Sequence, residues 1–402
     1  MRIALAWELG GGMGHVDRLA PWADELARRG ARVTAIMADL PLAAARLPIA
    51  QHALLQAPVL RHGPLAAGME QRSYAELLLA AGYGNPSTLE ALVQGWQSAL
   101  NLTKADLVLA DHAPTALLSA RIAGLPAVQI GDGFTIPPVG SLAFGQEEKV
   151  DTARHAAAAE RVLATIHRVQ RSHTSPLLPS LDALQDVDLT FLLSYPELDH
   201  YPGAARTCGY AGVPVAATAD GPTTLAIDRD GVARPAVFAY LKPKHPQFHA
   251  VARALAGLKV PVTVYAGGAP APDGAGHLDW RLLPLEVDAA IRATSLVVCH
   301  AGHGLVCQSL LAGRPLFLLP GSYEQLLTAR NVAALGAGIW IHPEAVEGQV
   351  RKGLLRSLAD AGPARKAWAF AQAHQRTPGQ LTAWLAESAD RICALAARRD
   401  AR

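Results

Sequence analysis

The chain has 402 residues, too many for a single ordinary hydrophobic core, so two domains are expected. Half of the residues are hydrophobic, 17% are charged and the net charge is +2, a globular composition that gives no reason to expect a nucleic acid or an anionic membrane surface as a partner. No stretch is long and apolar enough to span a bilayer, the start does not resemble a signal peptide, and the four cysteines form no CxxC pair. A cytoplasmic location with reduced thiols is therefore expected.

The first half of the chain alternates short apolar runs with amphipathic stretches, which indicates parallel β-α-β units. A strand is expected at residues 2–7, a glycine-rich loop at 10–14 and a helix at 15–29. The further strands and helices expected in this half are, in order, 32–37, 106–110, 115–123, 127–130, about 150–170 and 188–193.

Between about residues 209 and 235 the sequence becomes rich in Gly, Pro, Asp and Thr, which is typical of a linker. We therefore expect an N-terminal domain at 1–210, a linker at 211–235 and a C-terminal domain at 236–402. The strands and helices expected in the second half are 236–241, 247–258, 260–266, 296–300, 306–312, 316–319, 324–335 and about 380–397. The last helix is expected to pack back toward the N-terminal domain, and the pattern predicts two Rossmann-like, doubly wound α/β domains facing each other across a cleft.

The first glycine-rich turn places a histidine at the start of a helix. Residues 10–15 read Gly-Gly-Gly-Met-Gly-His, but the spacing fails as a dinucleotide-binding GxGxxG, because His15 stands where the last glycine is needed. The helix dipole at such a position favours a neutral imidazole, which can accept a proton.

The second turn, Cys299 to Gly304, also lies between an apolar strand and a helix. Its small residues expose backbone N–H groups at a helix start, which is a typical site for a diphosphate, and His300 is placed to reach a phosphate oxygen. Glu324 and Gln325 follow the next strand on the same edge of the sheet, where a carboxylate and an amide can bind sugar hydroxyls.

Residues 281–338 resemble the donor-binding signature of the GT-B, family 1 nucleotide-sugar glycosyltransferases. The resemblance is to the bacterial branch that glycosylates macrolides, phenolics and similar small molecules. Residues 10–34 resemble the start of that family, and residues 105–128 are more weakly similar.

The resemblance implies a role for individual residues. His15 matches the base that removes the proton of the acceptor hydroxyl, and Asp111 matches the carboxylate that orients it. The donor-binding residues that it implies are His300, Gly302, His303, Gly304, Gln308, Glu324, Gln325 and Leu283. The acceptor is expected near Gly12, Met13 and Phe134.

This chain departs from the family pattern at three donor positions. Leu305 replaces a Ser or Thr that donates to phosphate, Gln308 replaces a Glu that binds the ribose, and the tryptophan expected to stack on the base falls near Leu282. The nearest tryptophan is Trp280.

Each assignment has a simpler structural alternative. Asp111 could cap the helix that begins near Thr115, and Glu324 and Gln325 could cap theirs. His112 is expected to face solvent, and a surface position is an alternative for His303.

Two Asp-x-Asp strings, at 186–188 and 228–230, are not placed at strand ends, where metal-dependent glycosyltransferases hold a cation on the diphosphate. No metal and no cofactor are therefore expected. The activity that follows is inverting, metal-independent transfer of a sugar from a UDP- or TDP-sugar to a hydroxyl of a small apolar or aromatic acceptor. A sugar-nucleotide epimerase of GT-B architecture and a catalytically degenerate nucleotide-sugar-binding protein are the alternatives, and a homodimer is left open.

Overall fold

In the computed structural model the described residues are 1–48, 50–60, 71–141, 143–145, 151–215, 226–227, 233–234, 236–283 and 285–397. They form two compact units, which are described separately. Unit 1 comprises Met1–Pro214 and Thr382–Arg402, and unit 2 comprises Val215–Leu381. The greater part of the linker expected at 211–235 lies outside the described residues.

Unit 1 is built on a six-stranded parallel sheet with the strand order β3-β2-β1-β4-β5-β6. The strands are β1 Arg2–Trp7, β2 Arg32–Met37, β3 Ala53–Gln56, β4 Leu107–Asp111, β5 Ala127–Gly131 and β6 Leu189–Leu192. Its main helices are α1 Met13–Arg28, α2 Leu40–Arg46, α3 Tyr74–Leu78, α4 Pro86–Thr103, α5 Pro114–Ile122, α6 Thr152–Ser172 and most of α13 Pro378–Ala397. The order reverses at β1 and β4, so loops that follow these two strands meet at one edge, as in a Rossmann fold.

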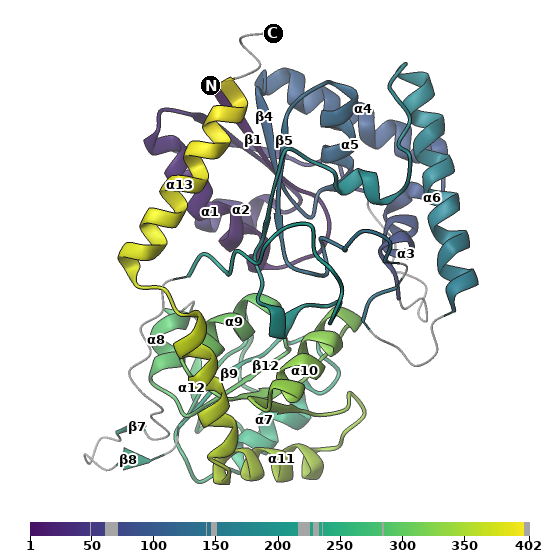
Figure 1. The fold of residues 1–402 in the computed structure, drawn as a ribbon. Helices are drawn as coiled ribbons and strands as arrows, with labels where there is room; N and C mark the ends of the chain where they lie inside the picture. Colours follow the sequence, from purple (N-terminus) through teal and green to yellow (C-terminus); the bar gives the residue numbers. More distant parts are fainter. Residues whose placement is uncertain are drawn as a thin grey trace. The chain divides into compact units, whose positions relative to one another are not determined.

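Alternating side chains of β1 fill two cores on opposite faces of this sheet. Leu5 and Trp7 join the core beneath α1, α2 and α13, whereas Ala4 and Ala6 face α4 and α5. In Figure 1 the yellow α13 runs beside the purple α1.

The end of the chain completes the first of these cores. Trp384 of α13 meets Trp22 of α1 edge-on, with ring centroids 5.3 Å apart, and Trp22 also contacts Phe191 of β6 at 4.9 Å. Ala389 and Ile392 are fully buried in the same cluster. The last helix thus belongs to the core of unit 1 although it follows unit 2 in the sequence.

Unit 2 repeats the same topology with a second parallel sheet, ordered β11-β10-β9-β12-β13-β14. Its strands are β9 Val237–Tyr240, β10 Val262–Tyr265, β11 Asp279–Arg281, β12 Leu296–Cys299, β13 Leu316–Leu318 and β14 Gly338–Trp340. Its helices are α7 Phe248–Ala256, α8 Val287–Arg292, α9 His303–Leu311, α10 Tyr323–Leu335, α11 Glu347–Ala359 and α12 Gly362–His374, and β7 Ala226–Ile227 pairs antiparallel with β8 Ala233–Arg234. The predicted pair of doubly wound domains is confirmed.

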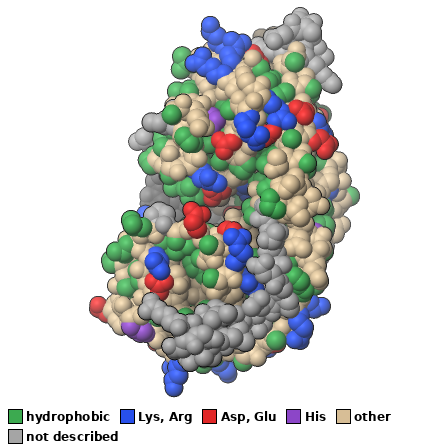
Figure 2. Space-filling view, turned by 90° about the vertical axis from the view of Figure 1, so that its left-hand side faces the viewer, with side chains coloured by type: hydrophobic (Ala, Val, Ile, Leu, Met, Phe, Trp, Pro, Cys, Tyr) green, Lys and Arg blue, Asp and Glu red, His purple; other side chains and the backbone are tan. Residues whose placement is uncertain are grey.

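Charged side chains of both signs are interspersed on the face drawn in Figure 2, in keeping with the small net charge. Among the described helices, none is long and apolar enough to cross a membrane.

Candidate functional site

His15 lies in the first turn of α1, just beyond the carboxyl end of β1. Gly12 precedes the helix with φ 95°, a left-handed conformation that suits glycine. The imidazole stacks on Trp7, with ring centroids 5.1 Å apart and an interplanar angle of 20°, and His15 is only 9% exposed. The ring is therefore held rigidly by packing.

Asp111, the last residue of β4, lies beside β1 and directs its carboxylate at His15. Its Oδ2 is 3.1 Å from Nδ1 of His15, and Asp111 is completely buried. Burial opposes ionisation of Asp111, but the charges and hydrogen bonds of Arg18 and His15 outweigh it and hold its pKa below the ordinary value. The structure thus brings together the two residues that the sequence placed in one site, and their roles in a reaction stay a prediction.

The helix-capping alternative for Asp111 is wrong. The residue that precedes α5 is Ala113, and the N–H and hydroxyl of Thr115 both donate to Glu8, at 2.8 and 2.5 Å. Glu8 caps this helix from the end of β1, which leaves the Asp111 carboxylate to His15 and Arg18.

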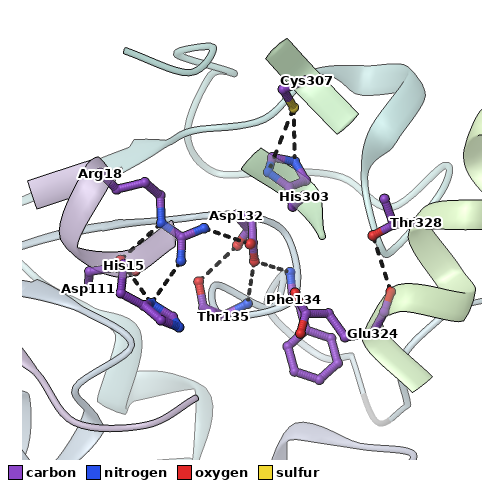
Figure 3. A network of polar contacts seen from close by, with 10 residues as sticks. All are labelled: His15, Arg18, Asp111, Asp132, Phe134, Thr135, His303, Cys307, Glu324 and Thr328. Atoms are coloured by element: carbon purple, nitrogen blue, oxygen red, sulfur yellow. Dashed lines mark hydrogen bonds and ion pairs between the residues drawn. The ribbon is translucent and has the colours of Figure 1, made fainter. Parts of the chain in front are cut away.

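Two residues that the sequence analysis missed complete this group. Arg18, one turn after His15 on α1, donates from Nε to Oδ2 of Asp111 at 3.0 Å and from Nη1 to Oδ2 of Asp132 at 2.8 Å. Asp132 follows β5 and also accepts the backbone N–H groups of Phe134 and Thr135. We call His15, Arg18, Asp111 and Asp132 the His15 cluster; Figure 3 shows Arg18 reaching from the side of His15 to Asp132.

The second ring nitrogen of His15 faces Gly10. A Cβ built on Gly10 would lie 2.5 Å from Nε2 of His15 and 3.4 Å from Nδ1 of His112, and Gly10 has φ 82°. Glycine is thus needed here for two reasons: the backbone has a positive φ, and a side chain would collide with Nε2.

The expectation that His112 faces solvent is wrong. It is 5% exposed, because a left-handed backbone, with φ 49°, turns it inward beside His15. Burial foremost, and then the neighbouring His15, lower the pKa of His112 to about 3, so this second imidazole is neutral.

The residues expected to contact an acceptor lie in unlike surroundings. Gly12 is exposed and Met13 half-buried at the start of α1. Phe134 is only 8% exposed and stacks on Phe144, with ring centroids 4.2 Å apart. Its ring belongs to the packed interior of unit 1 and leaves little free surface for an acceptor.

In unit 2 the turn from Cys299 to Gly304, here called the α9 turn, joins β12 to α9. Gly302 precedes the helix, and a Cβ built on Gly302 or Gly304 would meet no atom within 4 Å. Ala301 has φ 57°, an uncommon conformation for a residue with a side chain. The turn therefore presents open backbone at a helix N-terminus.

His303 begins α9 and is 3% exposed, with Sγ of Cys307 at 3.8 Å from its Nδ1, a contact drawn in Figure 3. The alternative of a surface position for His303 is therefore wrong.

His300 is committed to the backbone of its neighbours. Its Nδ1 lies 3.0 Å from the carbonyl oxygen of Leu319, to which it donates, and its Nε2 accepts the backbone N–H of Lys242 at 2.9 Å. Burial first, and then the charges of His245 and Lys242, lower the pKa of His300 to about 4. A neutral ring with both nitrogens bonded supplies neither a proton nor a positive charge, so the expected contact with a phosphate oxygen is corrected to a supporting role beneath the α9 turn.

Glu324 and Gln325 occupy the first turn of α10. The helix is capped by Ser322, whose hydroxyl accepts the N–H of Gln325, while the Gln325 side chain accepts the N–H of Gly321 at 2.8 Å. Gln325 therefore has a structural use in this state, and its amide NH₂ is the group left for a ligand. In Figure 3 the Thr328 hydroxyl donates to the Glu324 backbone carbonyl, not to its carboxylate.

Near β11, Leu282 and Leu283 are 54% and 78% exposed. Trp280 donates from its indole to the carbonyl of Ala269 at 2.8 Å and packs edge-on against Phe248. Trp280 is thus a packing residue, and Leu283 offers a nucleotide only an apolar surface. Gln308 is half-buried on α9.

Solved structures of glycosyltransferases share the whole architecture. The calicheamicin glycosyltransferase CalG4 has a TM-score of 0.67 at 21% identity, covering 99% of this chain and 98% of that one. The spinosyn rhamnosyltransferase SpnG, complexed with spinosyn aglycone, has a TM-score of 0.66 at 19% identity, covering 98% and 100%. The glycosyltransferase VinC, in complex with DTDP, gives 0.66 at 15% identity over 99% and 100%. At these identities the likeness establishes the fold.

Residues 285–377, which contain the α9 turn and α10, match the model of the glycosyltransferase family 28 C-terminal domain. The protein is a GT-B glycosyltransferase. Two curated relatives, PGL/p-HBAD biosynthesis rhamnosyltransferases of Mycobacterium bovis and Mycobacterium tuberculosis, are each 26% identical over 339 residues, covering 76% of this chain and 72% of theirs. The matched domain model is of family 28, whereas the sequence pattern resembled family 1.

The glycosyltransferase also carries two exposed lysines that the sequence analysis did not consider. Lys242 and Lys244 follow β9, and the bond from the Lys242 N–H to His300 anchors this loop to the residue that follows β12. A pair of lysines after a predicted strand was the available signal, since such loops gather at the carboxyl edge of a parallel sheet.

The buried carboxyl group of Glu8 should make the stability of this glycosyltransferase depend on pH. Burial raises its pKa from the ordinary value to about 7, although the Thr115 hydrogen bonds lower it. Because the folded pKa exceeds that of the unfolded chain, stability is full below the unfolded pKa and declines as the pH rises through about 7. The free energy of unfolding of wild type should therefore fall, relative to that of Glu8→Gln, by about 2–3 kcal/mol when the pH rises from mildly acidic to mildly alkaline. Denaturant unfolding at both pH values measures this.

The control is Glu160→Gln, on an exposed position of α6. Its stability should follow that of wild type at both pH values. If Glu8→Gln also follows wild type, the assignment of this dependence to Glu8 is wrong.

Proposed function

We propose that this glycosyltransferase moves a sugar from a nucleoside-diphosphate sugar, a UDP- or TDP-sugar, to a hydroxyl of a small apolar or aromatic acceptor, with inversion at the anomeric carbon and without a metal ion. The observation that carries the proposal is the buried pair of His15 and Asp111, 3.1 Å apart, with Nε2 facing the space beside Gly10. An imidazole oriented by a carboxylate is an effective general base for a hydroxyl.

In the proposed reaction the acceptor binds to unit 1 and the donor to unit 2. Nε2 of His15 takes the hydroxyl proton as the acceptor oxygen forms its bond to the anomeric carbon. The bond from that carbon to the diphosphate oxygen breaks, and the diphosphate leaves with the electron pair. Asp111 stabilises the imidazolium that forms.

The proposed diphosphate site is the α9 turn. The free space beside Gly302 and Gly304 and the dipole of α9 favour an anion, and Lys242 adds positive charge from the loop that is bonded to His300. In the proposed mechanism these groups neutralise the charge of the leaving diphosphate without a metal ion. Asp188, in the first Asp-x-Asp string, holds strand β5 by accepting the N–H of Ala127 at 2.9 Å, and the second string, 228–230, lies outside the described residues.

The names of the similar proteins suggest which donor and acceptors to test first. VinC was crystallised with DTDP, SpnG with spinosyn aglycone, and the curated relatives are rhamnosyltransferases. TDP-rhamnose is therefore the first donor to test. Phenols and macrolides with a free hydroxyl are the first acceptors to test, because the sequence resembles the family 1 branch that glycosylates such molecules.

The test incubates the purified enzyme with TDP-rhamnose or UDP-glucose and an acceptor panel, with and without EDTA. Mass spectrometry should detect the glycoside, and the NMR coupling or nuclear Overhauser pattern of the anomeric proton should show inversion. Donor conversion without any acceptor would favour the epimerase, and binding without turnover would favour the degenerate donor-binding protein. Loss of activity in EDTA that Mn²⁺ restores would contradict the metal-free mechanism.

Gly302→Ala tests the placement of the donor. The added methyl group meets no protein atom within 4 Å, so the variant should fold normally. It would stand where a diphosphate approaches the backbone, and the loss of one such contact should weaken TDP binding about tenfold. Calorimetric titration with TDP measures the Kd. Gly348→Ala on α11, where a Cβ also meets nothing, is the matched control and should bind TDP like wild type. Unchanged TDP affinity in Gly302→Ala would place the donor elsewhere.

A further inference from the structure

Arg18 is embedded in the His15 cluster, with three nitrogens engaged. Its side chain is only 12% exposed, and besides the bonds to Asp111 and Asp132 its Nη2 lies 2.9 Å from Nδ1 of His15. Burial opposes its charge, but Asp111 and Asp132 outweigh burial and raise the pKa of Arg18 further. Arg18 is therefore a permanent cation that can donate hydrogen bonds and cannot accept them.

This places two incompatible partners on one atom. Nδ1 of His15 faces Oδ2 of Asp111 at 3.1 Å, which requires a proton on Nδ1, and Nη2 of Arg18 at 2.9 Å, which requires a lone pair there. A neutral imidazole satisfies only one of them. With the proton on Nδ1, Nε2 is free to act as a base; with Nδ1 accepting from Arg18, the proton is on Nε2 and the base is blocked.

The charge distribution favours Arg18 in the resting protein. Oδ2 of Asp111 already accepts from Nε of Arg18, so the carboxylate keeps a charged donor whichever tautomer His15 adopts. Placing a proton on Nδ1 would set an imidazole N–H against a guanidinium N–H at hydrogen-bonding distance. The opposite tautomer replaces that repulsion with a hydrogen bond from a charged donor.

We propose that Arg18 is a positioning residue that competes with Asp111 for Nδ1 of His15, so that the resting protein holds His15 largely with its proton on Nε2. The active tautomer forms when Arg18 turns from Nδ1, Nδ1 takes up a proton from solvent beside Asp111, and the proton on Nε2 passes to solvent. The catalytic meaning of this exchange rests on the proposed function, whereas the tautomer itself does not.

Nitrogen-15 NMR of histidine-labelled full-length protein tests the proposal, because long-range proton–nitrogen spectra distinguish a protonated ring nitrogen from an unprotonated one. Spectra are recorded above the pH range in which imidazole titrates, and the His15 signals are those missing from His15→Ala. Wild type should show His15 protonated mainly at Nε2. Arg18→Lys keeps the charge but loses the planar fork, and should shift the proton to Nδ1. Asp111→Asn should shift it further to Nε2, because the asparagine amide can donate to Nδ1.

If Arg18 had only a structural role, the two variants would not shift the His15 proton in opposite directions. A wild-type His15 protonated at Nδ1 would overturn the proposal without any variant, as would an unchanged tautomer in Arg18→Lys. Wild type is assayed for transfer with the same donors and acceptors. If wild type forms no glycoside with any donor while the tautomers of the variants shift as expected, the proposed function fails and the competition at Nδ1 stands.

Discussion

Replacing His15 with alanine is expected to slow transfer to an ordinary alcohol by about 10²–10⁴-fold, the usual contribution of a general base. The reason is that His15 presents Nε2 to the space beside Gly10 while Asp111 lies at Nδ1. Steady-state kinetics with an aliphatic alcohol measures the loss in kcat. The Kd for TDP should be unchanged, because the proposed donor site lies in unit 2.

Two controls separate base catalysis from damage to the fold. A nitrophenol that is already ionised at the assay pH needs no base, so its transfer should fall much less in His15→Ala. His249→Ala, an exposed histidine on α7, should behave as wild type with both acceptors. Equal losses with the alcohol and the nitrophenol would contradict the base role, and His112 would be the next residue to test.

Gly10→Ala should have the second largest effect, a loss in kcat of about 10²-fold. The added Cβ would lie 2.5 Å from Nε2 of His15, so the imidazole must move or the space for the acceptor hydroxyl must close. A displacement of about 1 Å at a reacting group costs a factor of this order. Transfer kinetics measures the loss, with thermal unfolding recorded alongside.

Gly30→Ala is the matched control for backbone strain. Gly30 has φ 77°, close to the 82° of Gly10, but a Cβ there meets no atom within 4 Å. Gly10→Ala should therefore lose at least as much stability as Gly30→Ala, and only Gly10→Ala should lose activity. If Gly30→Ala is equally inactive, strain and not the contact with His15 explains the loss.

The alternation of apolar and amphipathic segments was enough to predict both doubly wound sheets, because parallel β-α-β units impose that pattern on the sequence. Not every element was predicted: the strands β3, β11 and β14 have only three or four residues, too few for a clear pattern, and helices α2, α3, α4, α8, α11 and α12 were also missed. The glycine turns located His15 and the α9 turn correctly, because few sequences need open backbone between a strand and a helix. Their neighbours depend on contacts between distant residues and could not be predicted in this way.

Three features of the site show which contacts could not be predicted from the sequence. Arg18 and Asp132 are 114 positions apart, and nothing local to either sequence segment pairs them. The inward position of His112 depends on its φ of 49°, which has no clear signature in a residue other than glycine. His300 was correctly placed at a strand end, but only the folded loops show that backbone groups of Leu319 and Lys242 use both of its nitrogens.

The position of α13 has a consequence for how the protein is made. Synthesis proceeds from the N-terminus, so the ribosome produces the sheet of unit 1 and all of unit 2 before Trp384 can reach Trp22 and Phe191. Throughout that interval the nascent chain carries an uncovered aromatic surface. Translation that stops within unit 2 would release a chain unable to bury this surface, and we expect such fragments to depend on chaperones or to aggregate.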